Sequence, residues 1–329
     1  MLRREAAADP ALMAAALKGL REYQEAQRPA PMPLMPAIAE AHGAVLRDYG
    51  GTGRPLLFVP SLINPPNVLD LSREKSLLRW LAARGHRVLL LDWGVEAVAR
   101  RDMSVGDHVE KILLPMIAAL NEAPVLAGYC LGGTMAMAAA ASAPVSGLIL
   151  IAAPWHFDAY PHEARKLLAQ LWNGAEPVGK AMGVFPMEVL QSAFWTLDPV
   201  RTVTKFAQFA ALARDDPKRD AFVALEDWAN DGPPLPSAAA RELFEDFFGR
   251  DRTGSGGWQV AGRTIDPARL ACPVLNVLST SDHIVPRNSA SRVGDTLAVI
   301  QGHVGMIVGS RATELREKLD TWTRTVAHM

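Results

Sequence analysis

One stretch of the chain, residues 125–141, has a pattern that few folds accommodate. It begins with the apolar run 125–127, continues through a glycine-rich segment around Cys130, and ends in a run of good helix formers. This order is typical of a strand, a tight turn and a helix. Gly128 and Gly132 stand two residues either side of Cys130, where so tight a turn leaves no room for side chains. The stretch therefore predicts a nucleophile elbow with cysteine in the nucleophile position.

The predicted turn places the Cys130 thiol at the N-terminus of the following helix. Free backbone N–H groups and the helix dipole favour a thiolate there, and the Leu131 N–H can help to hold an oxyanion. A second oxyanion donor is expected from the loop after the strand at 56–59, where the N–H groups of Ile63 and Leu62 are both candidates. The alternative for Cys130 is a buried structural cysteine in a glycine-rich turn, because free cysteines are often buried.

Apolar strands alternate with amphipathic helical segments along much of the chain. Strands that are apolar on both faces, separated by helices, are typical of an α/β fold with a mostly parallel sheet covered on both sides. The first two strands are expected to form a hairpin through the glycine-rich turn at 50–53. The predicted strands are 44–49, 55–59, 88–92, 125–127, 147–152, 274–279 and 298–300. The predicted helices are 10–27, 72–84, 105–121, 289–297 and 311–327.

The middle of the chain lacks the alternation of apolar strands and helices. Between residues 154 and 252 the strand pattern gives way to helical segments, and five of the eight tryptophans lie in or just beyond this stretch. We expect a helical cap at 154–257 inserted between two parts of an α/β core, 41–153 and 258–329, after a helix and proline-rich arm at 1–40. Aromatic residues of such a cap, among them Trp155 and Trp195, would form an apolar substrate pocket or a lid, or simply the core of the cap.

Composition narrows the function classes. The chain has 34 basic and 35 acidic residues, a balance that argues against nucleic-acid binding, which normally needs a basic surplus. No stretch approaches the roughly 20 apolar residues of a membrane span, and the N-terminus lacks the apolar segment of a signal peptide. We therefore expect a cytoplasmic protein with reduced thiols, in which the second cysteine, Cys272, is a core residue.

Two further residues complete a candidate catalytic set. Asp282 follows the apolar strand at 274–279, and His303 follows the strand at 298–300. The carboxyl ends of parallel strands meet at one edge of a sheet, so the order Cys, Asp, His suits a nucleophile, an orienting carboxylate and a base. Each residue alone has a plain structural alternative, an aspartate as a turn former and a histidine as a core side chain.

The segment Gly128-Tyr-Cys-Leu-Gly-Gly-Thr134 resembles that of the polyhydroxyalkanoate synthases. Other stretches resemble the same family in the same order, from about residue 49 to the C-terminus. They are Val59-Pro-Ser-Leu-Ile-Asn64, Val68-Leu-Asp-Leu71, Asp92-Trp-Gly94, Leu225-Glu-Asp-Trp-Ala-Asn-Asp231, Asp282-His-Ile-Val-Pro286 and Gly302-His-Val-Gly305.

This resemblance implies an acyltransferase with the α/β-hydrolase fold, in its short form. Such an enzyme moves 3-hydroxyacyl groups from coenzyme A thioesters onto a growing polyester, with Cys130 carrying the chain, His303 as base and Asp282 as its partner. We expect the coenzyme A thioester to be a substrate, with no cofactor and no metal. The residues expected to contact the substrate are Asn64, Tyr129, Trp155, Trp195 and His283.

The resemblance also bears on partners and leaves alternatives open. It implies a homodimer or a partner subunit, and contact with a polyester granule surface. A cysteine-dependent hydrolase of the same fold, either a thioesterase or an intracellular polyhydroxyalkanoate depolymerase, fits the same residues. A catalytically silent granule-binding relative is the third alternative, and an intact Cys, Asp and His set argues against it.

Overall fold

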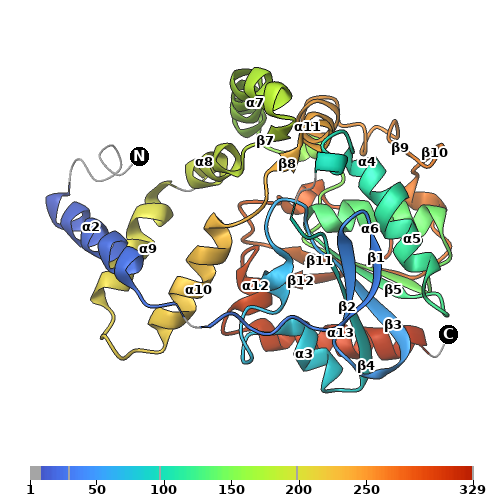
Figure 1. The fold of residues 1–329 in the computed structure, drawn as a ribbon, viewed down its shortest axis with the longest axis horizontal. Helices are drawn as coiled ribbons and strands as arrows, with labels where there is room; N and C mark the ends of the chain where they lie inside the picture. Colours follow the sequence, from blue (N-terminus) through green and yellow to red (C-terminus); the bar gives the residue numbers. More distant parts are fainter. Residues whose placement is uncertain (1–8, 29, 96–97, 198, 328–329) are drawn as a thin grey trace.

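A computed structural model describes residues 9–28, 30–95, 98–197 and 199–327. Within these residues the main sheet has eight strands in the order β1-β2-β4-β3-β5-β6-β11-β12 (Figure 1). From β4 to β12 all neighbouring strands are parallel, and β1 and β2 form an antiparallel edge. The strands are β1 Ala37–Ala41, β2 Ala44–Asp48, β3 Thr52–Val59, β4 His86–Asp92, β5 Val125–Tyr129, β6 Gly147–Ile151, β11 Val274–Ser279 and β12 Asp295–Val299.

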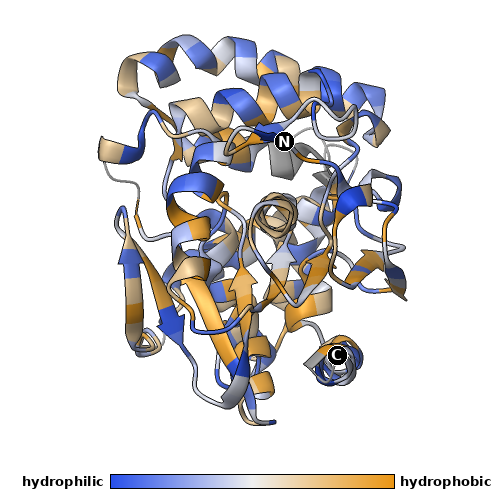
Figure 2. Ribbon diagram, turned by 90° about the vertical axis from the view of Figure 1, so that its right-hand side faces the viewer, coloured by the Kyte–Doolittle hydropathy of each residue, from blue (hydrophilic) through white to orange (hydrophobic). Residues whose placement is uncertain are grey.

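Helices cover both faces of this sheet. Successive residues of β3 point to opposite faces, so Leu57 packs in one core cluster and Phe58 in the other. Figure 2 shows the strands at the centre of the sheet as predominantly hydrophobic. One face is covered by α4 Val105–His108, the π-helical segment Val109–Leu113, α5 Leu114–Ala118 and α6 Leu131–Ser142. The other face is covered by α3 Leu77–Ala82, α12 Gly305–Val308 and α13 Ala312–Ala327.

The predicted hairpin between 44–49 and 55–59 is wrong. The two strands do not pair, because β4 lies between β2 and β3. A strand as apolar as β3 needs a buried neighbour on each side, and β4 and β5 supply both. The hairpin is instead formed by β1 and β2, through a two-residue turn at His42 and Gly43 with φ angles of 50° and 78°.

The helix predicted at 289–297 is also wrong. A 3-10 turn, Arg287–Ser289, ends where the predicted helix would begin. The chain then forms β12, which pairs with the free edge of β11. Gly294 has a φ of 76°, and a side chain on it would begin 2.2 Å from the Val274 carbonyl oxygen. The glycine therefore brings the chain close against β11 and starts the strand.

Between β6 and β11 the chain is mostly helical and lies over the carboxyl ends of the strands (Figure 1). This part of the chain also contains two short antiparallel strand pairs, β7 with β8 and β9 with β10. The helices are α7 His162–Met182, α8 Met187–Leu197, α9 Pro199–Ala211, α10 Lys218–Asn230, α11 Ser237–Arg241 and the π-helical segment Glu242–Gly249. The short strands are β7 Val184–Phe185, β8 Leu235–Pro236, β9 Gln259–Val260 and β10 Arg263–Thr264. Among the described residues, no helix combines the length and apolarity needed to cross a membrane.

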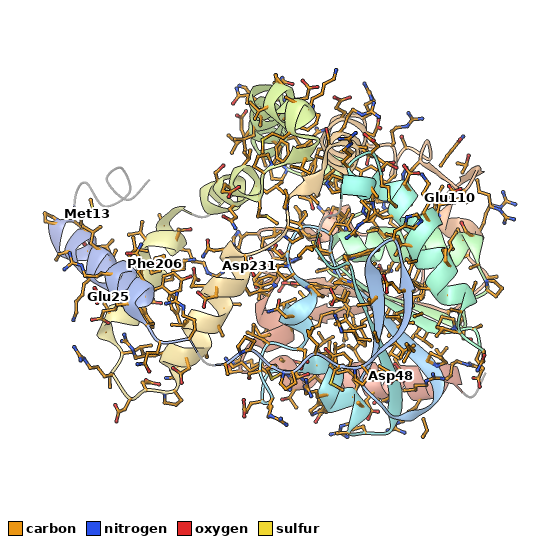
Figure 3. The ribbon with its side chains drawn as sticks, viewed as in Figure 1. Met13, Glu25, Asp48, Glu110, Phe206 and Asp231 are labelled. Carbon is orange, nitrogen blue, oxygen red and sulfur yellow. The ribbon has the colours of Figure 1, made fainter. Side chains whose placement is uncertain are left out.

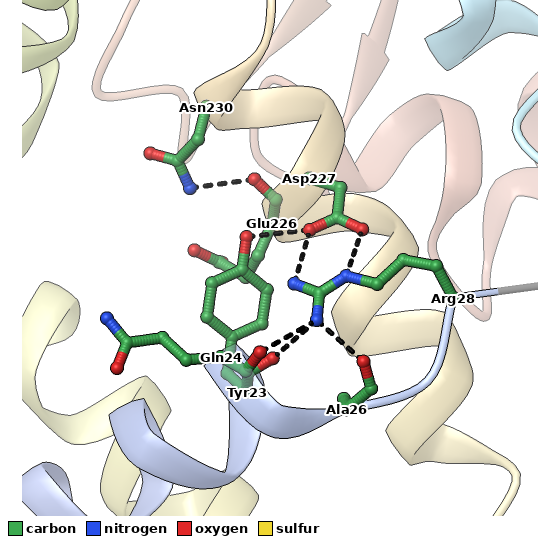
Figure 4. Close-up of polar contacts among 7 residues, drawn as sticks. All are labelled: Tyr23, Gln24, Ala26, Arg28, Glu226, Asp227 and Asn230. Carbon is green, nitrogen blue, oxygen red and sulfur yellow. Dashed lines mark hydrogen bonds and ion pairs between the residues drawn. The ribbon is translucent and has the colours of Figure 1, made fainter.

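The N-terminal helix α2, Pro10–Glu25, packs against α9 rather than against the sheet. Met13 and Phe206 lie at this contact (Figure 3), and a side chain at Gly19 would begin 1.9 Å from the Phe206 carbonyl oxygen. Just beyond the helix, Arg28 donates to Asp227 of α10 at 3.0 and 3.1 Å, and Tyr23 Oη donates to the same carboxylate at 2.7 Å (Figure 4). These contacts fasten the N-terminal segment to the helix that carries Trp228.

Candidate active site

Cys130 lies between β5 and α6 in a strained backbone conformation. Its φ and ψ angles are 55° and −130°, and its N–H donates to the Ile151 carbonyl oxygen at 2.9 Å. Residues other than glycine rarely adopt a positive φ. Such backbone strain is typical of functional sites. The strand, tight turn and helix lie where the sequence predicts them. The thiol consequently stands at the N-terminus of α6.

The strained turn depends on close backbone contacts at its glycines. A Cβ atom on Gly128 would lie 2.4 Å from the Gly133 Cα, and one on Gly132 would lie 2.1 Å from the Val59 carbonyl oxygen. Gly133 has the same role, since its Cβ would lie 2.2 Å from the Ala153 Cβ. The sequence pattern predicted such a close contact only for Gly128 and Gly132. All three allow α6 to approach the sheet closely enough to hold Cys130.

Gly132→Ala should therefore destabilise the protein, because the added methyl group collides with backbone that cannot move without disturbing β3. We expect the free energy of unfolding to fall by about 2–3 kcal/mol, the usual cost of overpacking. Gly174→Ala is the matched control, because a side chain at this helical glycine meets no atom within 4 Å. Urea denaturation of both variants measures the difference, and equal stability would contradict the close approach at Gly132.

His303 and Asp282 form a buried pair beside the elbow. The His303 Nδ1 lies 2.7 Å from the Asp282 Oδ2, and the side chains are 7% and 1% exposed. Asp282 Oδ1 accepts from the N–H groups of Ile284 and Val285 at 2.7 and 2.9 Å. Burial acts to raise the pKa of Asp282, but the bond from His303 and these two N–H groups outweigh it and lower the pKa. The carboxylate is thus held in the orientation that a histidine base requires.

His303 also interacts with Cys130. Burial alone lowers the pKa of the imidazole, but the charge of Cys130 and hydrogen bonds with Asp282 and Cys130 raise it to about 10. The arrangement therefore favours the imidazolium form of His303 beside Cys130. The Tyr129 ring lies against the imidazole at a centroid distance of 5.0 Å and a tilt of 31°, and its hydroxyl donates to the His303 carbonyl oxygen at 3.3 Å.

Cys130 and His303 open into one cavity of about 280 Å³. Its other walls come from the loop after β3, the loops after β11 and β12, and helices α8, α9 and α10. The lining residues are Pro60, Ser61, Ile63, Asn64, Pro65, Val68, Tyr129, Cys130, Gln191, Arg201, Thr202, Lys205, Trp228, Ala229, Ser281, His283, Ile284, Gly302, His303, Val304 and Gly305. This set combines a thiol at a helix N-terminus with space for a small ligand.

Comparison with known proteins identifies relatives of this chain by sequence. No protein-family model matches the chain. Curated relatives do: the poly(3-hydroxyalkanoate) polymerase subunit PhaC of Haloarcula marismortui is 27% identical over 83% of this chain, and that of Thiocystis violacea is 28% identical over 82%. This chain is similar to PhaC polymerase subunits along most of its length. It spans 61% of the Haloarcula protein, 56% of its Haloferax mediterranei counterpart, which is 28% identical, and 80% of the Thiocystis protein.

Solved structures show the fold of this chain. An esterase from Thermogutta terrifontis superposes with a TM-score of 0.53 at 18% identity, covering 92% of this chain and 100% of that chain. An N-acyl homoserine lactonase superposes with a TM-score of 0.55 at 17% identity, covering 89% and 97%. The chain therefore has the α/β-hydrolase fold that its sequence predicts.

The five residues expected to contact the substrate differ in where they lie. Asn64, Tyr129 and His283 line the cavity. Trp155 does not line it: the residue is 2% exposed, its ring lies 6.0 Å from that of Trp258, and its N–H donates to the Ser289 carbonyl oxygen at 2.6 Å. The expectation that Trp155 contacts substrate therefore finds no support, because its ring is buried beside Trp258 and outside the cavity. The side chain of Trp195 lies outside the described residues.

The two candidates for the second oxyanion donor differ in their contacts. The Ile63 N–H donates to Ser61 Oγ at 3.1 Å within its own loop. Ile63 would have to give up this bond in order to bind an oxyanion. Ile63 nevertheless lines the Cys130 cavity, whereas Leu62 is buried and does not line it. Each N–H therefore stays a candidate to act together with that of Leu131 at the start of α6.

The sequence pattern did not predict which residues the helical insertion contributes to the cavity, beyond the general expectation of an aromatic lid. They are Gln191, Arg201, Thr202, Lys205, Trp228 and Ala229. Trp228 Nε1 donates to the Pro65 carbonyl oxygen at 2.8 Å, which ties α10 to the loop after β3. The only signal for this residue was the family-like segment 225–231, because helical spacing does not show which face turns toward Cys130.

The raised pKa of His303 predicts a pH-dependent stability. A group with a higher pKa in the folded state contributes stability that is fully present below its unfolded pKa, here about 6.5. That contribution is lost progressively as the pH rises to about 10. We expect the difference in free energy of unfolding between wild type and His303→Gln to shrink over this range. Urea titrations across it provide the measurement, and a difference that grows with pH would contradict the assignment.

Proposed function

We propose that this protein is a polyhydroxyalkanoate synthase-like acyltransferase. Its substrates would be 3-hydroxyacyl coenzyme A thioesters, and its product a polyester chain carried on Cys130. The observation that carries the proposal is the buried Asp282–His303 pair beside the strained Cys130, opening into a cavity large enough for a short acyl group. The homology to PhaC polymerase subunits supports it.

The geometry suggests how the first half of the reaction proceeds. The Cys130 thiolate attacks the thioester carbonyl carbon, and the negative charge on the carbonyl oxygen is held by the N–H of Leu131 together with that of Leu62 or Ile63. The carbon–sulfur bond to coenzyme A then breaks, and His303 gives its proton to the departing thiolate. The products are free coenzyme A and an acyl thioester on Cys130, with His303 neutral.

The second half needs a hydroxyl group as acceptor. Neutral His303 removes the proton of the 3-hydroxyl group of a second hydroxyacyl coenzyme A as its oxygen attacks the acyl thioester on Cys130, and Asp282 stabilises the imidazolium that forms. The new ester leaves the chain, now one unit longer, on that coenzyme A and frees the Cys130 thiolate, which is again paired with His303. The next acylation returns the chain from coenzyme A to Cys130. Asn64 and His283, which line the cavity from the loops after β3 and β11, would bind the polar atoms of the substrate. This chemistry requires the side chains and substrate alone, without a cofactor.

The product of the purified protein tests the proposal. Incubation with 3-hydroxybutyryl coenzyme A should release coenzyme A and give oligomer or polymer detectable by mass spectrometry. Release of coenzyme A with only free hydroxy acid would overturn the synthase proposal and identify a cysteine-dependent thioesterase. No release at all, alone and with a partner subunit supplied, would favour a silent relative. Size-exclusion chromatography of the same samples would show whether activity follows a dimer.

A further inference from the structure

A second group of ligand-type side chains lies outside the Cys130 cavity, at the base of the helical insertion. His156 and Asp158 follow β6 on the segment that enters the insertion, and Asp251 lies on the segment that leaves it. One ligand atom from each of the three residues lies within 4.8 Å of the other two. None of these residues lines the Cys130 cavity.

The backbone around Asp251 directs one oxygen of its carboxylate into this group. Asp251 Oδ1 accepts from the N–H groups of Phe157 and Gly254 at 2.7 and 3.3 Å. A Cβ atom on Gly254 would lie 2.4 Å from Asp251 Oδ2 and 2.7 Å from His156 Nδ1. The second carboxylate oxygen and the imidazole nitrogen therefore face the same small space, which a glycine leaves open.

The segments that carry these ligands are already held in place. The His156 N–H donates to the Ser289 carbonyl oxygen at 2.8 Å, and the Thr253 hydroxyl donates to the Trp155 carbonyl oxygen. Asp251 itself has a φ of 47°, a conformation that aspartate tolerates better than most residues. Ligands fixed by backbone bonds lose little entropy when an ion binds.

We propose that His156, Asp158 and Asp251 bind one divalent cation of the Zn²⁺ class. An imidazole nitrogen and two carboxylate oxygens form a donor set suited to zinc, with bonds of about 2.0–2.2 Å. Small side-chain rotations bring atoms 4.8 Å apart or less to that distance from one ion. The cation also removes the repulsion between two neighbouring carboxylates. It joins the entering and leaving segments of the helical insertion and so stiffens the base of the cap over the cavity.

Zinc titration of the metal-free full-length protein tests this proposal. Calorimetry with ZnCl₂ should show one ion for each chain, and a hundredfold excess over Kd should raise Tm by about 3 °C or more. Asp158→Asn should raise Kd at least about tenfold, and it should fold normally because Asp158 is exposed. His156→Gln is the second variant. The matched controls His162→Gln and Asp102→Asn alter side chains that are 79% and 89% exposed, and both should bind zinc as wild type does.

Hydrogen exchange locates the ion. Zinc should slow amide exchange in segments 153–160 and 250–257 of the wild type and leave these segments unchanged in Asp158→Asn. Unchanged affinity in that variant, or binding that is lost in Cys130→Ala, would overturn the proposal by placing the ion elsewhere. Absence of saturable zinc binding would also overturn it, and would leave the three residues as a charge-paired turn.

Discussion

Cys130→Ala is expected to lower the turnover of acyl coenzyme A by at least about 10⁴-fold, an increase in the activation barrier of roughly 5.5 kcal/mol. The change removes the nucleophile, so no acyl-enzyme can form. The fold should persist, because alanine is smaller than cysteine and the glycines that permit the turn remain. Coenzyme A release and thermal melting would be measured on the same preparation.

Cys272→Ala is the matched control for this loss. Cys272 is half-buried, away from the cavity, and burial raises the pKa of its thiol. This variant should keep wild-type turnover with a small loss of stability. Turnover retained in Cys130→Ala would place the nucleophile elsewhere, and an unfolded Cys130→Ala protein would show that the thiol is mainly structural.

Loss of the base is expected to be nearly as damaging. His303→Gln should lower turnover by about 10³-fold or more, because glutamine can neither stabilise the thiolate as a cation nor transfer a proton. Asp282→Asn should lower turnover by about 10²–10⁴-fold, since asparagine no longer holds the imidazole in the required tautomer or stabilises its charge. The His303 change should therefore be at least as harmful as the Asp282 change.

Rapid-mixing experiments separate the two halves of the reaction in these variants. The burst of coenzyme A reports acylation of Cys130, and the later steady rate reports transfer of the acyl group. In His303→Gln we expect both phases to slow, with the steady rate more affected, because only the base can activate a hydroxyl acceptor. Asp102→Asn and His162→Gln, which alter exposed residues outside the cavity, should retain both phases. Wild-type rates in either His303→Gln or Asp282→Asn would contradict the proposed roles.

Local patterns determined the core of this protein. Five apolar segments became the central parallel strands β3, β4, β5, β6 and β11, since a strand without polar residues can only be stable when both faces are buried. The elbow at Cys130 could also be predicted, because its glycines and the following helix formers lie within one short stretch. Asp282 and His303 could be predicted as a pair since each follows an apolar strand, and parallel strands end at the same edge of the sheet.

Contacts between distant segments decided the rest. The partner of β3 is β4 rather than the strand next to it in sequence, and 295–299 became a strand because the edge of β11 was free to pair. Trp228 reached the cavity and Trp155 did not, although both are tryptophans in the same helical insertion. Likewise, Asp251 meets His156 only after about 95 intervening residues have folded over the sheet. Helical and strand periodicity shows which residues are buried, but the identity of the buried partner depends on three-dimensional packing that no local pattern encodes.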